Sequence, residues 1–186
     1  MRFLLASASP RRAELLARAG FSFEVMPVEV DETPGASETP RACVARLADG
    51  KAQIVARRHP GSVVLGADTV VVFEGRILGK PASEDDAAAT LAMLSGNWHE
   101  VLTGVSLYRD DRHVSDIVST AVHVLPLAPD EIAWYVASGE PLDKAGSYAV
   151  QGLASRFVDR VEGSYSNVVG LPIASVCRLL KELGER

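Results

Sequence analysis

Two adjacent arginines, Arg11 and Arg12, occupy the first turn of a predicted helix, where a cation is unfavourable. The preceding Ser9 suits the N-cap position and Pro10 the first helical position, so we expect the helix to start there. The positive end of the helix dipole lies at that start, and each cation placed there costs about 0.3–1 kcal/mol. A bound phosphate offsets this repulsion. The pair therefore indicates an anion site, with two solvated surface arginines as the alternative.

Asp68 stands between two continuous apolar runs, residues 63–67 and 70–73. A carboxylate in such surroundings is costly unless it is paired, hydrogen-bonded or bound to a metal. Asp68 is therefore a candidate general base or metal ligand at a strand end, with a plain turn between two strands as the alternative. Glu32, which follows Asp31 in a polar loop, offers a second carboxylate; the alternative for this pair is two solvated acids.

Two lysines and a glutamine complete the set of polar candidates. Lys51 falls on the apolar stripe of a helix predicted over residues 39–58, and it either reaches the surface or points into a polar cleft. Lys80, one predicted hairpin after Asp68, can contact a phosphate as a point charge. Gln151, next to a glycine, either presents its amide to the edge of a base or is a turn residue. Together, these groups suit metal-assisted attack of water on a phosphoanhydride, with no covalent intermediate.

The elements that must position these residues alternate along the chain. Strands or extended segments are predicted over residues 2–6, 21–30, 62–67, 70–73, 77–78, 100–109, 113–125 and 148–158, and helices over 10–19, 39–58, 83–94, 130–138 and 172–183. The segments 100–109 and 113–125 read as a hairpin. Because parallel and antiparallel pairings are both implied, we expect an α/β fold with a mixed sheet and helices on its faces.

The composition narrows the class of protein. The chain has 186 residues, of which 47% are hydrophobic and 23% charged, as in an ordinary soluble globular domain. Its net charge of −5 argues against a general binder of nucleic-acid polymers, and no apolar run is long enough to cross a membrane. Cys43 and Cys177 are expected to be reduced, and the four histidines lack the spacing of a zinc site. A cytoplasmic location is the simplest expectation.

Five segments resemble, in order, those of the Maf-like nucleoside triphosphate pyrophosphatases. They are residues 7–12, 66–70, 78–81, 141–152 and 167–172. The resemblance runs from end to end and implies one domain over residues 1–186. It also implies a long, twisted mixed sheet flanked by helices, in two lobes with a central cleft, similar to inosine triphosphate pyrophosphatases. A homodimer is common in this family.

The resemblance implies hydrolysis of a nucleoside triphosphate between its α- and β-phosphates, with Mg²⁺ or Mn²⁺ as cofactor. Asp68 would accept the proton, and Glu32 and Asp68 would hold the metal. The substrate-binding positions would be Ser7, Ser9, Arg11, Arg12, Lys51, Thr69, Lys80 and Gln151. On the sequence alone, Arg12→Ala should weaken nucleotide binding and leave the helix intact or slightly more stable, because it removes a cation from the positive helix end.

Three positions mark the base that the family accepts, here Arg12, Thr69 and Gln151. This combination looks like the branch that acts on dTTP and UTP rather than the branch that prefers 7-methyl-GTP. A glutamine amide can both donate to and accept from a thymine or uracil edge. Two alternatives stand beside this hypothesis: house-cleaning of modified pyrimidine nucleotides, and a nucleotide-binding regulator of cell division and septum formation.

Overall fold

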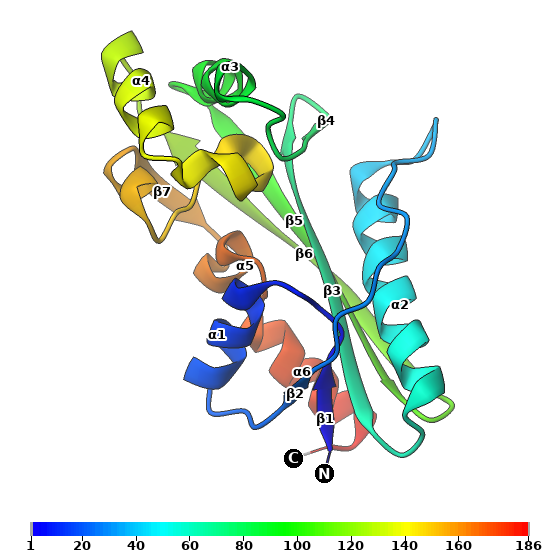
Figure 1. Cartoon of the computed structure of the whole chain (residues 1–186). Coiled ribbons are helices and arrows are strands. Elements are labelled where there is room, and N and C mark those ends of the chain that lie inside the picture. Colours follow the sequence, from blue (N-terminus) through cyan, green and yellow to red (C-terminus); the bar gives the residue numbers. More distant parts are fainter. Residues whose placement is uncertain (1, 186) are drawn as a thin grey trace. The chain divides into compact units, whose positions relative to one another are not determined.

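The computed structural model describes residues 2–185. Within them the strands are β1 Phe3–Leu5, β2 Glu24–Val25, β3 Val63–Phe73, β4 Arg76–Leu78, β5 Trp98–Arg109, β6 Arg112–Val124 and β7 Val158–Glu162. The α-helices are α1 Pro10–Arg18, α2 Pro40–Arg58, α3 Glu84–Leu94, α4 Pro129–Ala137, α5 Tyr165–Val169 and α6 Ile173–Leu183. Three short 3₁₀ helices follow α4, namely η1 Glu140–Asp143, η2 Ala145–Ser147 and η3 Leu153–Arg156. Figure 1 shows these elements along the chain.

The strands form one mixed sheet, as predicted. Its order is β2-β1-β3-β5-β6-β7, with β4 also beside β3. Strand β1 runs parallel to both β2 and β3, whereas β4 is antiparallel to β3 and β7 is antiparallel to β6. The prediction of an α/β fold with parallel and antiparallel pairings is therefore confirmed.

The chain divides into two compact units. The first comprises the described residues up to Thr69, together with Thr103–Val118 and the segment from Gly170 onwards. The second comprises Val70–Leu102 and Ser119–Val169. Strands β3, β5 and β6 contribute residues to both units, so neither unit is a continuous piece of chain.

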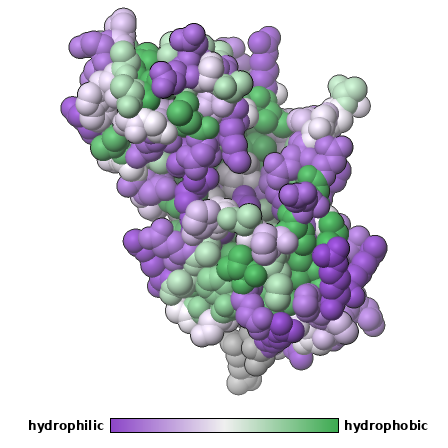
Figure 2. Space-filling view, viewed as in Figure 1, coloured by the Kyte–Doolittle hydropathy of each residue, from purple (hydrophilic) through white to green (hydrophobic). Residues whose placement is uncertain are grey.

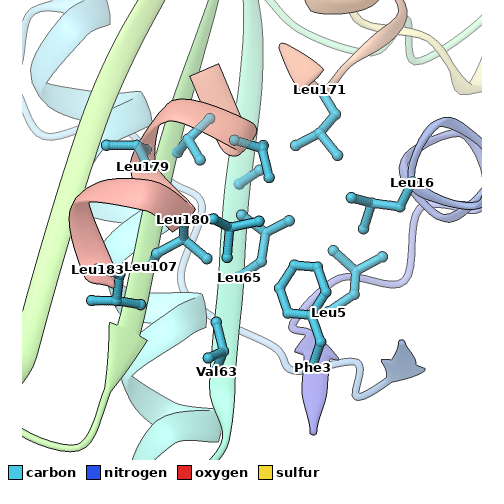
Figure 3. Packing of buried hydrophobic residues seen from close by; sticks show 13 residues of the cluster. Phe3, Leu5, Leu16, Val63, Leu65, Leu107, Leu171, Leu179, Leu180 and Leu183 are labelled. Atoms are coloured by element: carbon cyan, nitrogen blue, oxygen red, sulfur yellow. The ribbon is translucent and has the colours of Figure 1, made fainter. Parts of the chain in front are cut away.

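In the first unit, α2 lies on one side of β3, and α1 and α6 lie on the other (Figure 1). The alternation of side chains along β3 produces this arrangement. Leu65 points into a cluster with Leu16 of α1 and Leu179 of α6, shown in Figure 3. Val64 points the other way and packs in a cluster with Val55 of α2. A strand with helices on both faces needs apolar residues at consecutive positions, which explains the unbroken apolar run.

Two glycines let α2 lie directly on the sheet. A Cβ atom at Gly66 of β3 would lie 2.2 Å from the carbonyl oxygen of Ala48, and one at Gly104 of β5 would lie 2.3 Å from that of Val44. Both distances are far shorter than a van der Waals contact, so no larger residue fits while α2 keeps its place. The glycines thus determine how close this helix comes to β3.

The second unit contains a buried histidine, His99 on β5. Its Nε2 lies 2.7 Å from the hydroxyl of Tyr148, and only 4% of the residue is exposed. Burial, helped by the charge of His123, lowers the pKa of His99 to about 4. The imidazole is therefore neutral in the folded protein at neutral pH.

We expect this histidine to make stability depend on pH. Its pKa rises to the ordinary value of about 6.5 on unfolding, so the unfolded chain binds a proton more readily than the folded one. The contribution of His99 to the free energy of unfolding is therefore complete above pH 6.5 and is lost as the pH falls toward 4. The loss is on the order of 3 kcal/mol. Urea unfolding at several pH values measures it, with His99→Gln as the comparison because glutamine does not titrate. An equal pH dependence in both proteins would contradict the assignment to His99.

Three predicted elements differ from the structure. The strand expected over 21–30 is limited to Glu24–Val25, where Pro27 cannot donate to a strand ladder. Strand β3 runs unbroken through Asp68, so neither a strand end nor a turn lies there. The segment 148–158 is not extended: it contains η3, and β7 begins only at its last residue. Helix α5 had no predicted counterpart.

The face of the molecule in Figure 2 is covered mostly by hydrophilic residues, with hydrophobic ones between them. Among residues 2–185, no helix is both long enough and apolar enough to cross a bilayer. Cys43 and Cys177 are free thiols, and Cys43 is buried.

Candidate active site

Asp68 and Thr69 lie on a stretch of β3 that does not pair with β1. Strand β1 accompanies β3 only as far as Leu65, and β4 pairs with β3 only from Val71 onwards. Within the first unit, residues 66–69 of β3 therefore extend beyond the last residue that pairs with β1. Polar side chains on this stretch can meet groups from loops and from a ligand.

A buried lysine lies between the two predicted acids. The Nζ atom of Lys51 is 2.7 Å from a carboxylate oxygen of Asp68 and 2.7 Å from one of Glu32. Lys51 is 7% exposed and Asp68 8%, whereas the side chain of Glu32 is 62% exposed. Lys51 therefore does not reach the bulk solvent. The first of its two predicted interpretations, a lysine that reaches the surface, is wrong. One cation between two carboxylates leaves a net charge of −1 in this group.

The position of α2 on β3 brings Lys51 to Asp68. Lys51 follows Ala48 by less than one helical turn, and Ala48 is the residue that rests on Gly66 of β3. Asp68 is two residues beyond Gly66, on the same face of the strand. The glycine in β3 thus sets the separation between the two charged groups.

Arg12 is buried on the other face of β3 and makes three hydrogen bonds. Its Nε donates to the carbonyl oxygen of Gly170 at 3.0 Å, one Nη to Ser7 Oγ at 3.1 Å, and the other to Thr69 Oγ1 at 3.2 Å. Burial lowers the pKa of Arg12, opposed by the charge of Asp68. Arg12 is 8% exposed, so the alternative of a solvated arginine is wrong for this residue.

The Arg12 network joins segments that are far apart in the sequence. Thr69 Oγ1 also lies 2.9 Å from the hydroxyl of Thr103 and donates to the carbonyl oxygen of Gly170 at 3.2 Å. Gly170 has φ = 131°, in the range that favours glycine, and its carbonyl accepts from both polar side chains. Gly170 was not among the candidate site residues, although it lies in one of the five family-like segments. A backbone carbonyl carries no residue-type signal, which is why the pattern of residue types missed it.

The start of α1 differs from the starts of α2 and α3. Thr39 and Ser83 cap their helices by accepting from the backbone N–H groups of Ala42 and Asp86, each at 3.2 Å. Ser9 occupies the N-cap position of α1, but its side chain makes no capping hydrogen bond. The first turn of α1 also has no acidic residue, whereas that of α3 has three. The side chain of Ser9 therefore does not cap α1, unlike those of Thr39 and Ser83 in their helices.

Lys80 and Gln151 belong to the second unit. Both are exposed, and neither makes a hydrogen bond or ion pair within residues 2–185. Gln151 follows five buried residues, 146–150. In the same unit, the N–H of Gly146 donates to the carbonyl oxygen of Gly79 at 3.1 Å, which ties this segment to the turn that carries Lys80.

The structure thus gathers the candidates into defined groups. In the first unit it joins Ser7, Arg12 and Thr69 through hydrogen bonds, and Glu32, Lys51 and Asp68 through ion pairs. Ser9 and Arg11 lie beside Arg12 at the start of α1. Across residues 2–185 there is no cluster of three or more His, Cys, Asp or Glu side chains suited to a metal. Glu32 and Asp68 are a pair of oxygen donors around one ammonium group.

We expect Arg12→Ala to lower stability, contrary to the expectation from the helix dipole alone. The substitution removes the three hydrogen bonds that the buried guanidinium donates, which costs about 2–3 kcal/mol and lowers Tm by roughly 5–10 °C. Thermal unfolding without nucleotide tests this, with Arg18→Ala as the control because Arg18 is 76% exposed at the other end of the same helix. A Tm that is unchanged or raised in Arg12→Ala would restore the dipole argument.

Comparison with known proteins identifies the relatives of this chain. A protein of Syntrophus aciditrophicus, named dTTP/UTP pyrophosphatase, is 49% identical over 185 residues, covering 98% of this chain and 90% of the relative. One of an Anaeromyxobacter species with the same name is 52% identical over 188 residues, with the same coverage. The Staphylococcus aureus Ham1 protein aligns at a TM-score of 0.45 and 15% identity, over 67% of this chain and 72% of that one. The family model described as Maf-like protein matches residues 2–183, and the chain belongs to the Maf family.

Proposed function

We propose that this chain hydrolyses dTTP and UTP to the nucleoside monophosphate and pyrophosphate. Relatives of about 50% identity over nearly the whole chain are named dTTP/UTP pyrophosphatase. The observation that carries the proposal is the buried Asp68 on the stretch of β3 that does not pair with β1, with Lys51 on one face and Arg12 on the other. Positive and negative groups at one short segment suit an anionic substrate and a base that activates water.

In the reaction, a water oxygen forms a bond to the α-phosphorus, and the bond from that phosphorus to the bridging oxygen breaks. Asp68 accepts a proton from the water, and pyrophosphate leaves with the bridging oxygen. The start of α1 with Arg11 and Arg12, together with Lys51 and Lys80, binds the phosphates. Charge-assisted donors of this kind stabilise the negative charge that develops in the transition state.

The donor set of the first unit fits Mg²⁺ or Mn²⁺. Glu32 and Asp68 both direct an oxygen at the position of the Lys51 ammonium, so their arrangement already accommodates a positive charge. Mg²⁺ is commonly held by one or two carboxylates together with substrate phosphates and water. Bound there, the ion would polarise the phosphates and lower the pKa of a water. Without it, Lys51 balances one of the two negative charges of Glu32 and Asp68.

The selection of the base is assigned to Gln151, with Thr69 and Arg12 as the other two positions of the dTTP/UTP branch. The Gln151 amide is exposed and makes no hydrogen bond within residues 2–185, so it remains available to a ligand. An amide offers a donor and an acceptor, which complement the N3–H and carbonyl groups of thymine and uracil. We further propose a cytoplasmic homodimer of single-domain chains, in keeping with the two free thiols.

The decisive experiment measures pyrophosphate release from the four ribo- and four deoxyribonucleoside triphosphates, with Mg²⁺, Mn²⁺ or a chelator. We expect metal-dependent release from dTTP and UTP and little from the others. Methylated pyrimidine triphosphates belong in the same panel, because a much higher kcat/KM for them would favour house-cleaning of modified nucleotides. If no triphosphate releases pyrophosphate, the enzymatic proposal fails and a nucleotide-binding role remains.

A further inference from the structure

Glu140 holds the segment that follows Gln151. In the second unit, one oxygen of its carboxylate accepts from the backbone N–H of Leu153 at 3.0 Å, and the other from that of Ala154 at 3.4 Å. These N–H groups belong to the first turn of η3, where no earlier residue can accept from them. Glu140 thus caps η3 from a position 13 residues before Leu153 in the chain.

Tyr135 holds the segment that precedes Gln151. Its hydroxyl accepts from the backbone N–H of Ala149 at 3.1 Å and donates to Glu140 at 2.7 Å. The ring is fully buried and packs edge-on against Phe157, with the ring centres 5.7 Å apart. Burial raises the pKa of Tyr135, so its hydroxyl keeps the proton that it donates.

The two residues therefore fix both ends of a tight turn that presents Gln151. The N–H of Gly152 donates to the carbonyl oxygen of Ala149 at 2.9 Å, which closes the turn around Gln151. A Cβ atom at Gly152 would lie 2.1 Å from the carboxylate of Glu140, so the turn rests directly on this carboxylate. Tyr135 and Glu140 are bonded to each other, which makes them one support under both ends of the turn.

The position of the Gln151 amide depends on the backbone of the turn alone. Its side chain is exposed and makes no hydrogen bond of its own within the described chain. A flexible amide discriminates poorly between bases, since hydrogen bonds to a base edge need both partners in a defined geometry. We propose that Tyr135 and Glu140 are positioning residues that set the pyrimidine specificity of this chain through the Gln151 turn. This inference rests on the proposed function and on the assignment of Gln151 to the base.

The test compares Tyr135→Phe and Glu140→Gln with two matched controls. Tyr148→Phe removes another buried hydroxyl of the same unit, one that bonds His99 instead of the turn. Glu131→Gln alters a carboxylate that caps a different helix by accepting from the N–H of Ala128. For each protein, kcat and KM are measured with dTTP and with dCTP. Cytosine has an acceptor at N3 and an amino donor at position 4, where thymine has a donor and an acceptor.

We expect each of the two variants to lower the ratio of kcat/KM for dTTP to that for dCTP by about tenfold, mainly through KM for dTTP, with the controls unchanged. In a Gln151→Ala background, Tyr135→Phe should lower the ratio no further, because both act through the same amide. An unchanged ratio with a lower Tm would show that the pair only stabilises the unit, and would overturn the inference. A further tenfold loss in the Gln151→Ala background would do the same.

Amide hydrogen exchange separates this inference from the proposed function. In Tyr135→Phe, exchange of the Ala149 N–H should become at least about tenfold faster, and in Glu140→Gln that of Leu153 and Ala154. If these rates are unchanged, the positioning role fails whatever the activity. If they rise as expected but Gln151→Ala leaves the dTTP/dCTP ratio of the wild type intact, the assignment of Gln151 to the base fails instead.

Discussion

Asp68→Asn is expected to lower kcat for dTTP by about 10²–10⁴-fold while the chain stays folded. Asparagine has nearly the same shape and keeps an oxygen that can accept from Lys51 Nζ, which lies 2.7 Å from the carboxylate. It cannot take up the proton of the attacking water, however, so the loss should fall on the chemical step. Pyrophosphate release gives kcat, and calorimetry with a non-hydrolysable dTTP analogue gives the Kd, which should change much less than kcat.

Asp49→Asn is the matched control for this variant. Asp49 lies in the same unit and accepts from the hydroxyls of Ser106 and Tyr108, at 3.2 and 2.8 Å. It contacts none of the proposed site residues, so its kcat should stay within about twofold of the wild type. Wild-type turnover in Asp68→Asn, with an unchanged dependence on the metal, would show that Asp68 is not the base.

Gly66→Ala is expected to lower the free energy of unfolding by at least about 3 kcal/mol. The new Cβ would lie 2.2 Å from the carbonyl oxygen of Ala48 and 2.7 Å from the N atom of Ala52. Both are backbone atoms of α2, so a side-chain rotation cannot relieve the overlap and the helix must move away from β3. Since Lys51 lies between these two residues, its contact with Asp68 should weaken, and kcat should fall in the molecules that fold.

The control for this prediction lies in the same helix. Gly50 of α2 has only Val30 Cγ1 within reach of an added Cβ, at an ordinary 3.8 Å. Gly50→Ala should therefore raise stability by up to about 1 kcal/mol through helix propensity. Urea unfolding followed by circular dichroism measures both variants. Equal stability of Gly66→Ala and the wild type would mean that α2 does not rest on β3 as closely as the structure has it.

Several elements could be predicted from the sequence because they depend on near neighbours. The helices at 40–58 and 84–94 start beside Thr39 and Ser83, whose side chains accept from an N–H three residues later, as expected of N-caps. The hairpin of β5 and β6 is predicted from two runs separated by a polar turn, and the two strands are neighbours in the sheet. By contrast, the segment 148–158 is predicted as extended, whereas Tyr135 and Glu140 hold part of it in a turn through contacts that are distant in the sequence.

The candidate site was predictable in its residue types and not in its contacts. Sequence determined that an acid in an apolar run, a lysine on an apolar helix face and two arginines at a helix start all needed partners, because burying a charge without a partner is costly. Only the tertiary structure decided which partners those are. Lys51 meets Asp68 across 17 residues, and Arg12 meets Thr69 across 57 and Gly170 across 158. Such pairings follow from how helices pack on the sheet, and local sequence patterns do not contain that information.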